Sequence, residues 1–228
     1  MVIFDVVIPV GPKDKDKITK QLIYTKKNIV GYRKIFIITD LTFNPSLDGV
    51  VIIPEHFFPF NKTHINTERS GWNLQQLFKI YAWKVCPNIL PQYLVIDCDT
   101  FFLKKTIFWE NNIPLYNYGS EYHQPYFEHI SRLIPSIQRQ GNKSGITHHM
   151  IFEKHYLEEL FSMVDGLFWE RFLSVIDDSE NSGASEYELY FHFMNQYYPQ
   201  KIKIRELSWE NGGSLNSELD YVSHHWYL

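Results

Sequence analysis

The chain has 228 residues, and its 22 Lys and Arg residues against 26 Asp and Glu residues give a formal net charge of −4. This near-balance excludes a protein that binds nucleic acid through a basic surface, and 44% apolar residues exclude a disordered chain. The length fits one compact domain or at most two small ones. Trp, Tyr and Phe make up 17% of the residues, so either the packing is unusually aromatic or some rings line a site. An AT-rich source genome would also favour this composition.

The two cysteines, Cys86 and Cys98, are too few for a disulfide framework or a zinc cage. They are typical of a reducing compartment, so we expect a soluble cytoplasmic protein. No apolar run approaches the ~18 residues of a membrane-spanning helix, and the first residues carry no basic signal-like segment. We therefore expect no transmembrane segment.

Strand-like and helix-like segments alternate along the first half of the chain. The apolar, β-branched run at residues 3–10 predicts a strand buried on both faces. Such alternation predicts an α/β domain with a mainly parallel sheet, whose ligands bind at the carboxyl ends of the strands. The remaining segments are a helix at 18–29, strands at 34–39 and 49–53, a loop at 54–69, a helix capped by Ser70 and ending at 85, and a strand at 93–96.

The second half of the chain has a less regular pattern. Stretches with helical spacing alternate there with short apolar runs, and Gly212-Gly213 predicts a turn. The predicted elements are helices at 126–137, 153–164, 167–176 and 185–197, and strands at 145–152 and 202–207.

Asp97-Cys98-Asp99 follows the strand at 93–96 directly. In an extended segment the two carboxylates point the same way, and they repel each other unless a cation or a proton lies between them. Mg²⁺ or Mn²⁺ fits such oxygen ligands and leaves room for a diphosphate. The alternative is that one aspartate caps a turn while the other is solvated. A dehalogenase-type phosphatase is disfavoured, because Thr100 follows the second aspartate directly and Phe101 takes the position that such a phosphatase needs for Thr or Val.

The order of these motifs resembles that of the GT-A class of nucleotide-sugar glycosyltransferases. The resemblance rests on VVIPVGPKD, GWNLQQLFKIYA, YLVIDCDTFFL, GITHHMIF, SEYELY and the terminal SHHW. It implies one Rossmann-like α/β domain over residues 1–228, with a nucleotide-binding half at 1–103 and an acceptor-binding half at 104–228. It also implies transfer of a sugar from a nucleoside diphosphate, UDP in the first place, to a carbohydrate hydroxyl with the help of Mn²⁺ or Mg²⁺.

The resemblance also assigns roles to residues. Asp97 and Asp99 would lie at the ribose and the metal, and Asp99 is both the firmer ligand and a catalytic residue through that metal. His224 or His225 would complete the metal shell, unless the His-His-Trp segment is only a surface tail or an incidental aromatic patch. The best-known retaining subgroup has a longer late motif with Gly and Lys, so retention is not implied. The residues that would border the base and ribose are Ile8, Pro9, Val10, Gly11 and Asp14.

Further candidates come from the helix before the aspartates and from the segment at 145–152. Lys79 could meet a phosphate, or it could be solvated like most polar residues on a helix face. Arg69 and Trp72 suggest a loop anchor and a ring wall. His148 and His149 correspond to the family strand whose leading loop touches the donor sugar. Because neighbours on a strand point to opposite faces, only one of these two should reach the site.

Ser185 is a predicted N-cap, which places Glu186 in the first turn of its helix, where the helix dipole stabilises a carboxylate. Glu186 is either the general base of an inverting transfer or a plain capping carboxylate, and Glu188 replaces it if the register is off by two. Rings in the segments at 54–62 and 116–127 either line an acceptor cleft or belong to core loops. The candidate rings are Phe57, Phe60, Tyr116, Tyr122 and Tyr126.

The rival hypothesis is a carbohydrate-binding or inactive transferase-like protein, which keeps the rings but needs no metal. The sequence leaves open the donor sugar, the acceptor, the linkage, the stereochemistry and the oligomeric state.

Overall fold

The computed structural model describes residues 2–40, 49–65, 69–177, 179 and 182–224. A five-stranded central sheet has the order β3-β2-β1-β4-β8. The first four strands run parallel, and β8 runs antiparallel to β4, so the predicted mainly parallel sheet is confirmed. The strands are β1 (Phe4–Pro9), β2 (Tyr32–Thr39), β3 (Val50–Pro54), β4 (Gln92–Ile96) and β8 (His149–Glu153).

Strand β1 lies in the middle of this sheet, and all six of its residues are buried. Chain connections from β1 run to β2 on one side, while β4 pairs with β1 on the other, with Val7 opposite Val95. The strand order therefore reverses between β1 and β4. In open α/β sheets, ligands bind in the crevice outside the carboxyl ends of the strands at such a reversal. Gly11 and Asp97 follow β1 and β4 at that edge.

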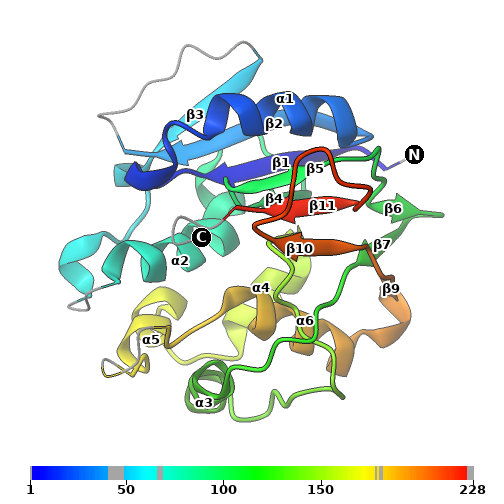
Figure 1. Cartoon of the computed structure of the whole chain (residues 1–228). Coiled ribbons are helices and arrows are strands. Elements are labelled where there is room, and N and C mark those ends of the chain that lie inside the picture. Colours follow the sequence, from blue (N-terminus) through cyan, green and yellow to red (C-terminus); the bar gives the residue numbers. More distant parts are fainter. Residues whose placement is uncertain (1, 41–48, 66–68, 178, 180–181, 225–228) are drawn as a thin grey trace.

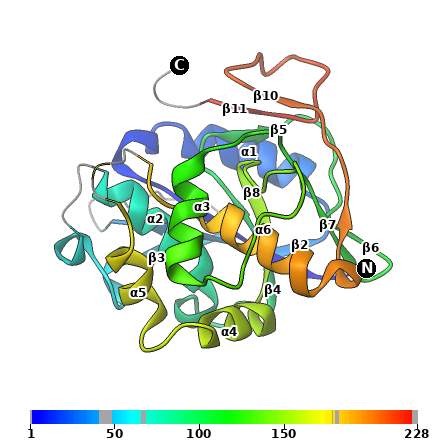
Figure 2. The same ribbon diagram turned by 90° about the horizontal axis from the view of Figure 1, so that it is seen from below.

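Helices cover both faces of the sheet. Figure 1 shows α1 above the sheet and the other helices below it, and the view from below places α3 and α6 in front of the strands (Figure 2). α2 packs against both β1 and α6, which explains why most of its residues are buried. The helices are α1 (Ile18–Asn28), α2 (Ser70–Val85), α3 (Gln124–Leu133), α4 (Lys154–Ser162), α5 (Phe168–Ser174) and α6 (Glu186–Tyr197), with 3₁₀ turns η1 (Pro12–Asp14), η2 (Glu55–Phe57), η3 (Lys62–His64) and η4 (Pro199–Lys201).

Two small sheets, which the sequence pattern did not predict, flank the central one. In the first, β11 lies between β10 and β5 and pairs antiparallel with β5, so Ser223 lies opposite Thr100. This pairing places β11, near the end of the chain, beside β5, which follows Asp97. The strands of the two small sheets are β5 (Thr100–Phe102), β10 (Trp209–Asn211) and β11 (Tyr221–Ser223), then β6 (Trp109–Glu110), β7 (Ile113–Tyr116) and β9 (Lys203–Ile204).

Several predicted boundaries were wrong. Ser70 is the first residue of α2 rather than its cap, and Arg69 occupies the cap position. α3 ends at Leu133 because Pro135 disfavours a helical conformation at residue 134. The strand predicted at 145–152 begins only at His149, the loop at 54–69 contains two 3₁₀ turns, and the strand predicted at 202–207 shrinks to β9.

The core explains much of the aromatic content. Phe60, Tyr116 and Tyr126 are buried, which fits the alternative that these rings belong to core loops, whereas Phe57 and Tyr122 are exposed. Within the described ranges, no helix is long and apolar enough to cross a membrane.

Candidate active site

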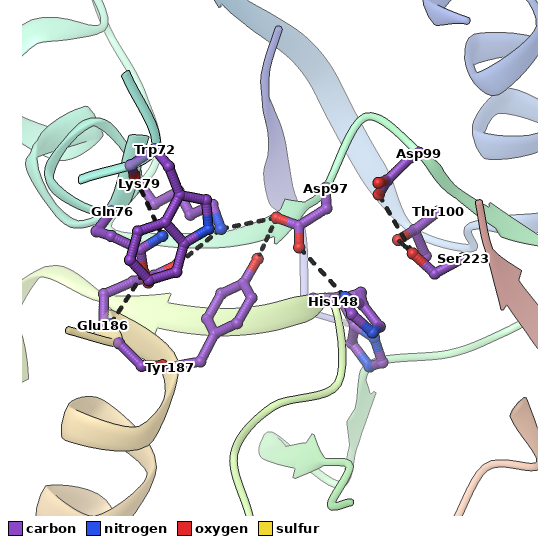
Figure 3. Close-up of polar contacts among 12 residues, drawn as sticks. Trp72, Gln76, Lys79, Asp97, Asp99, Thr100, His148, Glu186, Tyr187 and Ser223 are labelled. Atoms are coloured by element: carbon purple, nitrogen blue, oxygen red, sulfur yellow. Dashed lines mark hydrogen bonds and ion pairs between the residues drawn. The ribbon is translucent and has the colours of Figure 1, made fainter. Parts of the chain in front are cut away.

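The carboxylate of Asp97, just past the end of β4, is contacted by side chains from three other segments (Figure 3). Lys79 of α2 places its Nζ 2.7 Å from Oδ1, and the Tyr187 hydroxyl of α6 donates to the same oxygen at 2.9 Å. His148 holds its Nδ1 3.6 Å from Oδ2. Burial alone would raise the pKa of Asp97, but Lys79 and His148 outweigh it and bring the pKa below its usual value. Asp97 is therefore an anion at neutral pH.

Lys79 joins two carboxylates that lie far apart in the chain. Its Nζ also lies 2.7 Å from Oε1 of Glu186, and its side chain is only 3% exposed. The ammonium sits 4.1 Å from the centre of the Tyr187 ring. Burial lowers a lysine pKa, but Asp97 and Glu186 together more than reverse that effect, so the pKa of Lys79 is raised. Lys79 is thus a buried cation rather than the solvated residue that was the alternative.

Glu186 is the first residue of α6, and the predicted cap is confirmed because Ser185 Oγ accepts the Glu188 N–H at 3.2 Å. The Glu186 N–H donates to Oε1 of Gln76, which ties α6 to α2. Its carboxyl is 1% exposed, and burial raises its pKa to about 7 against the opposing effect of Lys79. Within the described ranges, Oε2 has no hydrogen-bond partner. A carboxylate with such an oxygen and a pKa near neutrality is suited to accept a proton.

The start of α2 lies beside Glu186. Gln76 connects Trp72 to Glu186, because its Nε2 donates to the Trp72 carbonyl while its Oε1 accepts from Glu186. The Trp72 ring is half-buried and lies parallel to that of Tyr126, with centroids 6.3 Å apart. Arg69 lies over Trp72 and donates to Ser182 Oγ, as expected of a loop anchor, while the role of the Trp72 ring as a wall of the site stays a prediction.

On the other side of Asp97, a second group of acidic residues gathers at the carboxyl ends of β1 and β4. Asp99 accepts a hydrogen bond from the Ser223 hydroxyl at 3.2 Å. The pKa of Asp14, in η1, is raised by burial and then by repulsion from Asp99, against the attraction of Lys17. Three carboxylates, Asp14, Asp97 and Asp99, thus share one electrostatic environment at the reversal of strand order.

These residues could bind a divalent cation only if phosphates or waters supply part of its ligands. In the described part of the chain, no three His, Cys, Asp or Glu side chains are grouped as a ligand set. However, Mg²⁺ at phosphate sites is commonly bound by only one or two carboxylates, with substrate phosphates and waters supplying the rest. The oxygen donors and the mutual repulsion of these aspartates fit that case. Because Oδ1 of Asp97 is already engaged by Lys79 and Tyr187, Asp99 would be the better ligand for such a cation.

The two candidate late ligands are placed differently. The Nε2 of His224 lies 2.6 Å from the carbonyl of Gly213, and its ring packs against Phe101. Its backbone N–H donates to the Asp99 carbonyl, so the segment lies next to the acidic group. His225 lies outside the described residues.

The adjacent histidines also separate. His148 precedes β8 with a left-handed φ of 61° and faces Asp97. His149 is enclosed by the rings of Phe102, Phe108 and Tyr221, and burial lowers its pKa to about 3. The expected donor contact for His149 is therefore wrong, because its side chain belongs to the core.

At the end of β1 only part of the predicted set is accessible. Ile8, Pro9 and Val10 are buried within the sheet, which leaves Gly11 and Asp14 partly exposed at its carboxyl edge. A Cβ at Gly11 would meet no described atom within 4 Å, so there is open space beside it. Tyr187 and Ser223 contact the two aspartates. They lie in the motifs SEYELY and SHHW, but the sequence analysis gave neither residue a role.

Comparison with solved structures supports the fold. The crystal structure of mouse xyloside xylosyltransferase 1 in its apo form matches with a TM-score of 0.54 and 8% sequence identity, over 99% of each chain. No curated protein matches the sequence. A family model, described as a family of unknown function, matches residues 19–208, which is most of the chain. The chain therefore belongs to that family, DUF6492.

Proposed function

We propose that this protein is a glycosyltransferase that moves a sugar from a nucleoside diphosphate, UDP in the first place, to a hydroxyl of a carbohydrate acceptor. The fold shared with a xylosyltransferase supports the class. The observation that carries the proposal is the pair of ion contacts that Lys79 makes with Asp97 and Glu186. They connect an acidic edge suited to a cation and a diphosphate with a buried carboxylate suited to accept a proton.

The donor would bind across the carboxyl ends of β1 and β4. The open space at Gly11 allows the nucleoside to approach the backbone, and Asp14 and Asp97 are close enough there to repel each other. Asp99, with Asp97 as its neighbour, would hold Mn²⁺ or Mg²⁺. When bound, that cation offsets charge on the leaving diphosphate as a Lewis acid.

Glu186 would act on the acceptor. Its Oε2 takes the proton of the acceptor hydroxyl while the hydroxyl oxygen forms a bond to the anomeric carbon. The bond between that carbon and the diphosphate oxygen breaks, and the diphosphate leaves with the electron pair. Lys79 holds Oε1 and keeps Oε2 as the proton acceptor. A transfer with this base inverts the anomeric configuration, so the anomer of the product tests the role of Glu186.

A thermal-shift experiment tests donor binding. UDP with Mn²⁺ at 100 times its dissociation constant should stabilise the protein by about 2.7 kcal/mol, which corresponds to a rise in Tm of about 5 to 10 °C for a chain of this size. Excess chelator should remove most of the rise. If neither UDP nor any other nucleotide shifts the Tm, the proposed function is wrong.

A variant pair tests the cation site. Asp99→Ala should abolish Mn²⁺-dependent hydrolysis of the UDP-sugar that the thermal shift selects, whereas Asp165→Ala, which removes an exposed aspartate, should keep it. Undiminished hydrolysis in Asp99→Ala would show that the metal assignment is wrong. A carbohydrate-binding protein without transferase activity would bind acceptor sugars but show no nucleotide shift.

A further inference from the structure

Glu188, two residues beyond Glu186, is a fully buried carboxylate surrounded by donors. Its Oε1 accepts the Ser144 hydroxyl at 2.6 Å, and its Oε2 accepts the Gly145 N–H at 2.9 Å. His192, one turn along α6, places Nε2 3.1 Å from Oε2. A carboxylate so engaged is not available as a base, so Glu188 does not replace Glu186. Burying a polar group is costly unless it is hydrogen-bonded, and Ser144 and Gly145 supply hydrogen bonds to the two oxygens of Glu188.

Ser144 and Gly145 belong to the loop at residues 140–148, and His192 contacts the beginning of that loop. Its Nδ1 accepts the Gln140 N–H at 2.9 Å, which requires that the ring proton be on Nε2 in the neutral tautomer. In that tautomer the proton is on the nitrogen that lies 3.1 Å from Oε2 of Glu188. The pair Glu188–His192, which we call the α6 clamp, therefore holds the loop at residue 140 and again at residues 144 and 145.

The loop has little freedom to move where it is held. A Cβ on Gly145 would lie 2.5 Å from the Tyr187 carbonyl and 2.6 Å from Phe191 Cβ, so the backbone lies directly on α6. Ser144 exchanges backbone hydrogen bonds with Gly119 at 2.9 and 3.0 Å. The contacts of Glu188 thus fix the position of the backbone on α6.

His148, three residues after Gly145 in the loop, contacts Asp97. The His148 carbonyl accepts the Asp97 N–H at 2.9 Å, and its ring faces the Asp97 carboxylate (Figure 3). Its left-handed backbone conformation is uncommon for a residue with a Cβ, so the surrounding contacts must hold it in place.

We infer that the α6 clamp positions the loop at 140–148, so that His148 lies against Asp97, and that affinity for a nucleoside diphosphate depends on this clamp. Glu188 and His192 are positioning residues, since they act through the loop. The dependence of donor affinity rests on the proposed function, whereas the clamping of the loop does not.

Glu188→Gln is the test, because it keeps the shape of the side chain but replaces one accepting oxygen by an amide that faces other donors. The matched control is Asp5→Asn. Asp5 is also fully buried and accepts the backbone N–H groups of Lys34 and Leu90, yet it lies in β1 beside Arg33, away from the loop. His192→Phe removes both histidine contacts and serves as a second variant.

Two measurements separate positioning from general stability. Hydrogen exchange of peptides covering 140–148 should become faster in Glu188→Gln and His192→Phe, but not in Asp5→Asn at a similar loss in Tm. Calorimetry with UDP and Mn²⁺ should show binding weakened about 10- to 100-fold in the clamp variants, with Asp5→Asn like the wild type.

The inference is overturned if exchange in 140–148 is unchanged in Glu188→Gln, or if Asp5→Asn weakens UDP binding as much. If the wild-type protein binds no UDP, the proposed function fails and the dependence of affinity fails with it. The exchange measurement then still decides whether the clamp holds the loop.

Discussion

Lys79 of α2 and Asp97 beyond β4 form a 2.7 Å ion pair in which the lysine side chain is 3% exposed. Glu186 lies at the same distance from the same ammonium. Removing one partner of a buried pair leaves an uncompensated charge in a poorly solvated place, and this costs more than the net stabilisation that the pair itself contributes. Lys79, Asp97 and Glu186 therefore contribute to the stability of the fold as well as to the candidate active site.

We expect Lys79→Met to destabilise the protein by about 3 to 5 kcal/mol, because it leaves Asp97 and Glu186 without their cation. Urea unfolding measures the loss. The double variant Lys79→Met with Glu186→Gln should recover part of the lost stability, since only one carboxylate then lacks its cation. Lys84→Met, at an exposed position on the same helix, should cost little. Equal stability of the two single variants would contradict the burial of a charged Lys79.

Glu186 should set the pH dependence of transfer. Its pKa is raised to about 7 by burial, so the ionised base that accepts the proton becomes populated as the pH rises from 6 to 8. The rate should rise over that range. Glu186→Gln should flatten the profile and lower kcat about 10²- to 10⁴-fold. A wild-type profile retained in Glu186→Gln would exclude Glu186 as the base.

Glu153 should make stability fall with rising pH. Burial raises its pKa from 4.5 in the unfolded chain to about 7 in the folded protein. The contribution of its neutral form is present in full below pH 4.5 and is lost as the pH rises through 7. Glu153→Gln should therefore stabilise the protein at pH 8 relative to wild type more than at pH 5, as read from Tm. Glu158→Gln, an exposed control, should show no such difference between the two pH values.

Two glycine variants should behave oppositely. Gly145→Ala places a methyl group 2.5 Å from the Tyr187 carbonyl and should cost about 1 to 3 kcal/mol, because the loop must move off α6. Gly71→Ala, in α2, meets no described atom within 4 Å and should be neutral or slightly stabilising, since Ala favours the helix. A Gly145→Ala protein as stable as Gly71→Ala would mean that the loop is not held against α6.

Local patterns in the sequence were enough to predict the parallel strands of the central sheet. The runs that became β1, β2, β3 and β4 are continuous and apolar, because strands of a parallel sheet are buried on both faces. Ser185 was recognisable as a cap from its residue type and position, and Asp97 as a strand-end residue. The strands β5 to β7 and β9 to β11 have at most four residues each, too few to show an alternating pattern.

By itself the sequence determined a mainly parallel α/β sheet and placed the pair Asp97 and Asp99 at its carboxyl edge, because hydrophobic period and turn chemistry act within a few residues. Only the tertiary structure decided that Lys79 is buried between two carboxylates, that Glu188 is used to hold a loop, and that His149 belongs to the core while His148 does not. Those outcomes depend on contacts such as Tyr187 with Asp97 and Ser223 with Asp99, which are separated by 90 and 124 residues. No local pattern reports which residues will meet across such separations, because packing of the whole chain decides it.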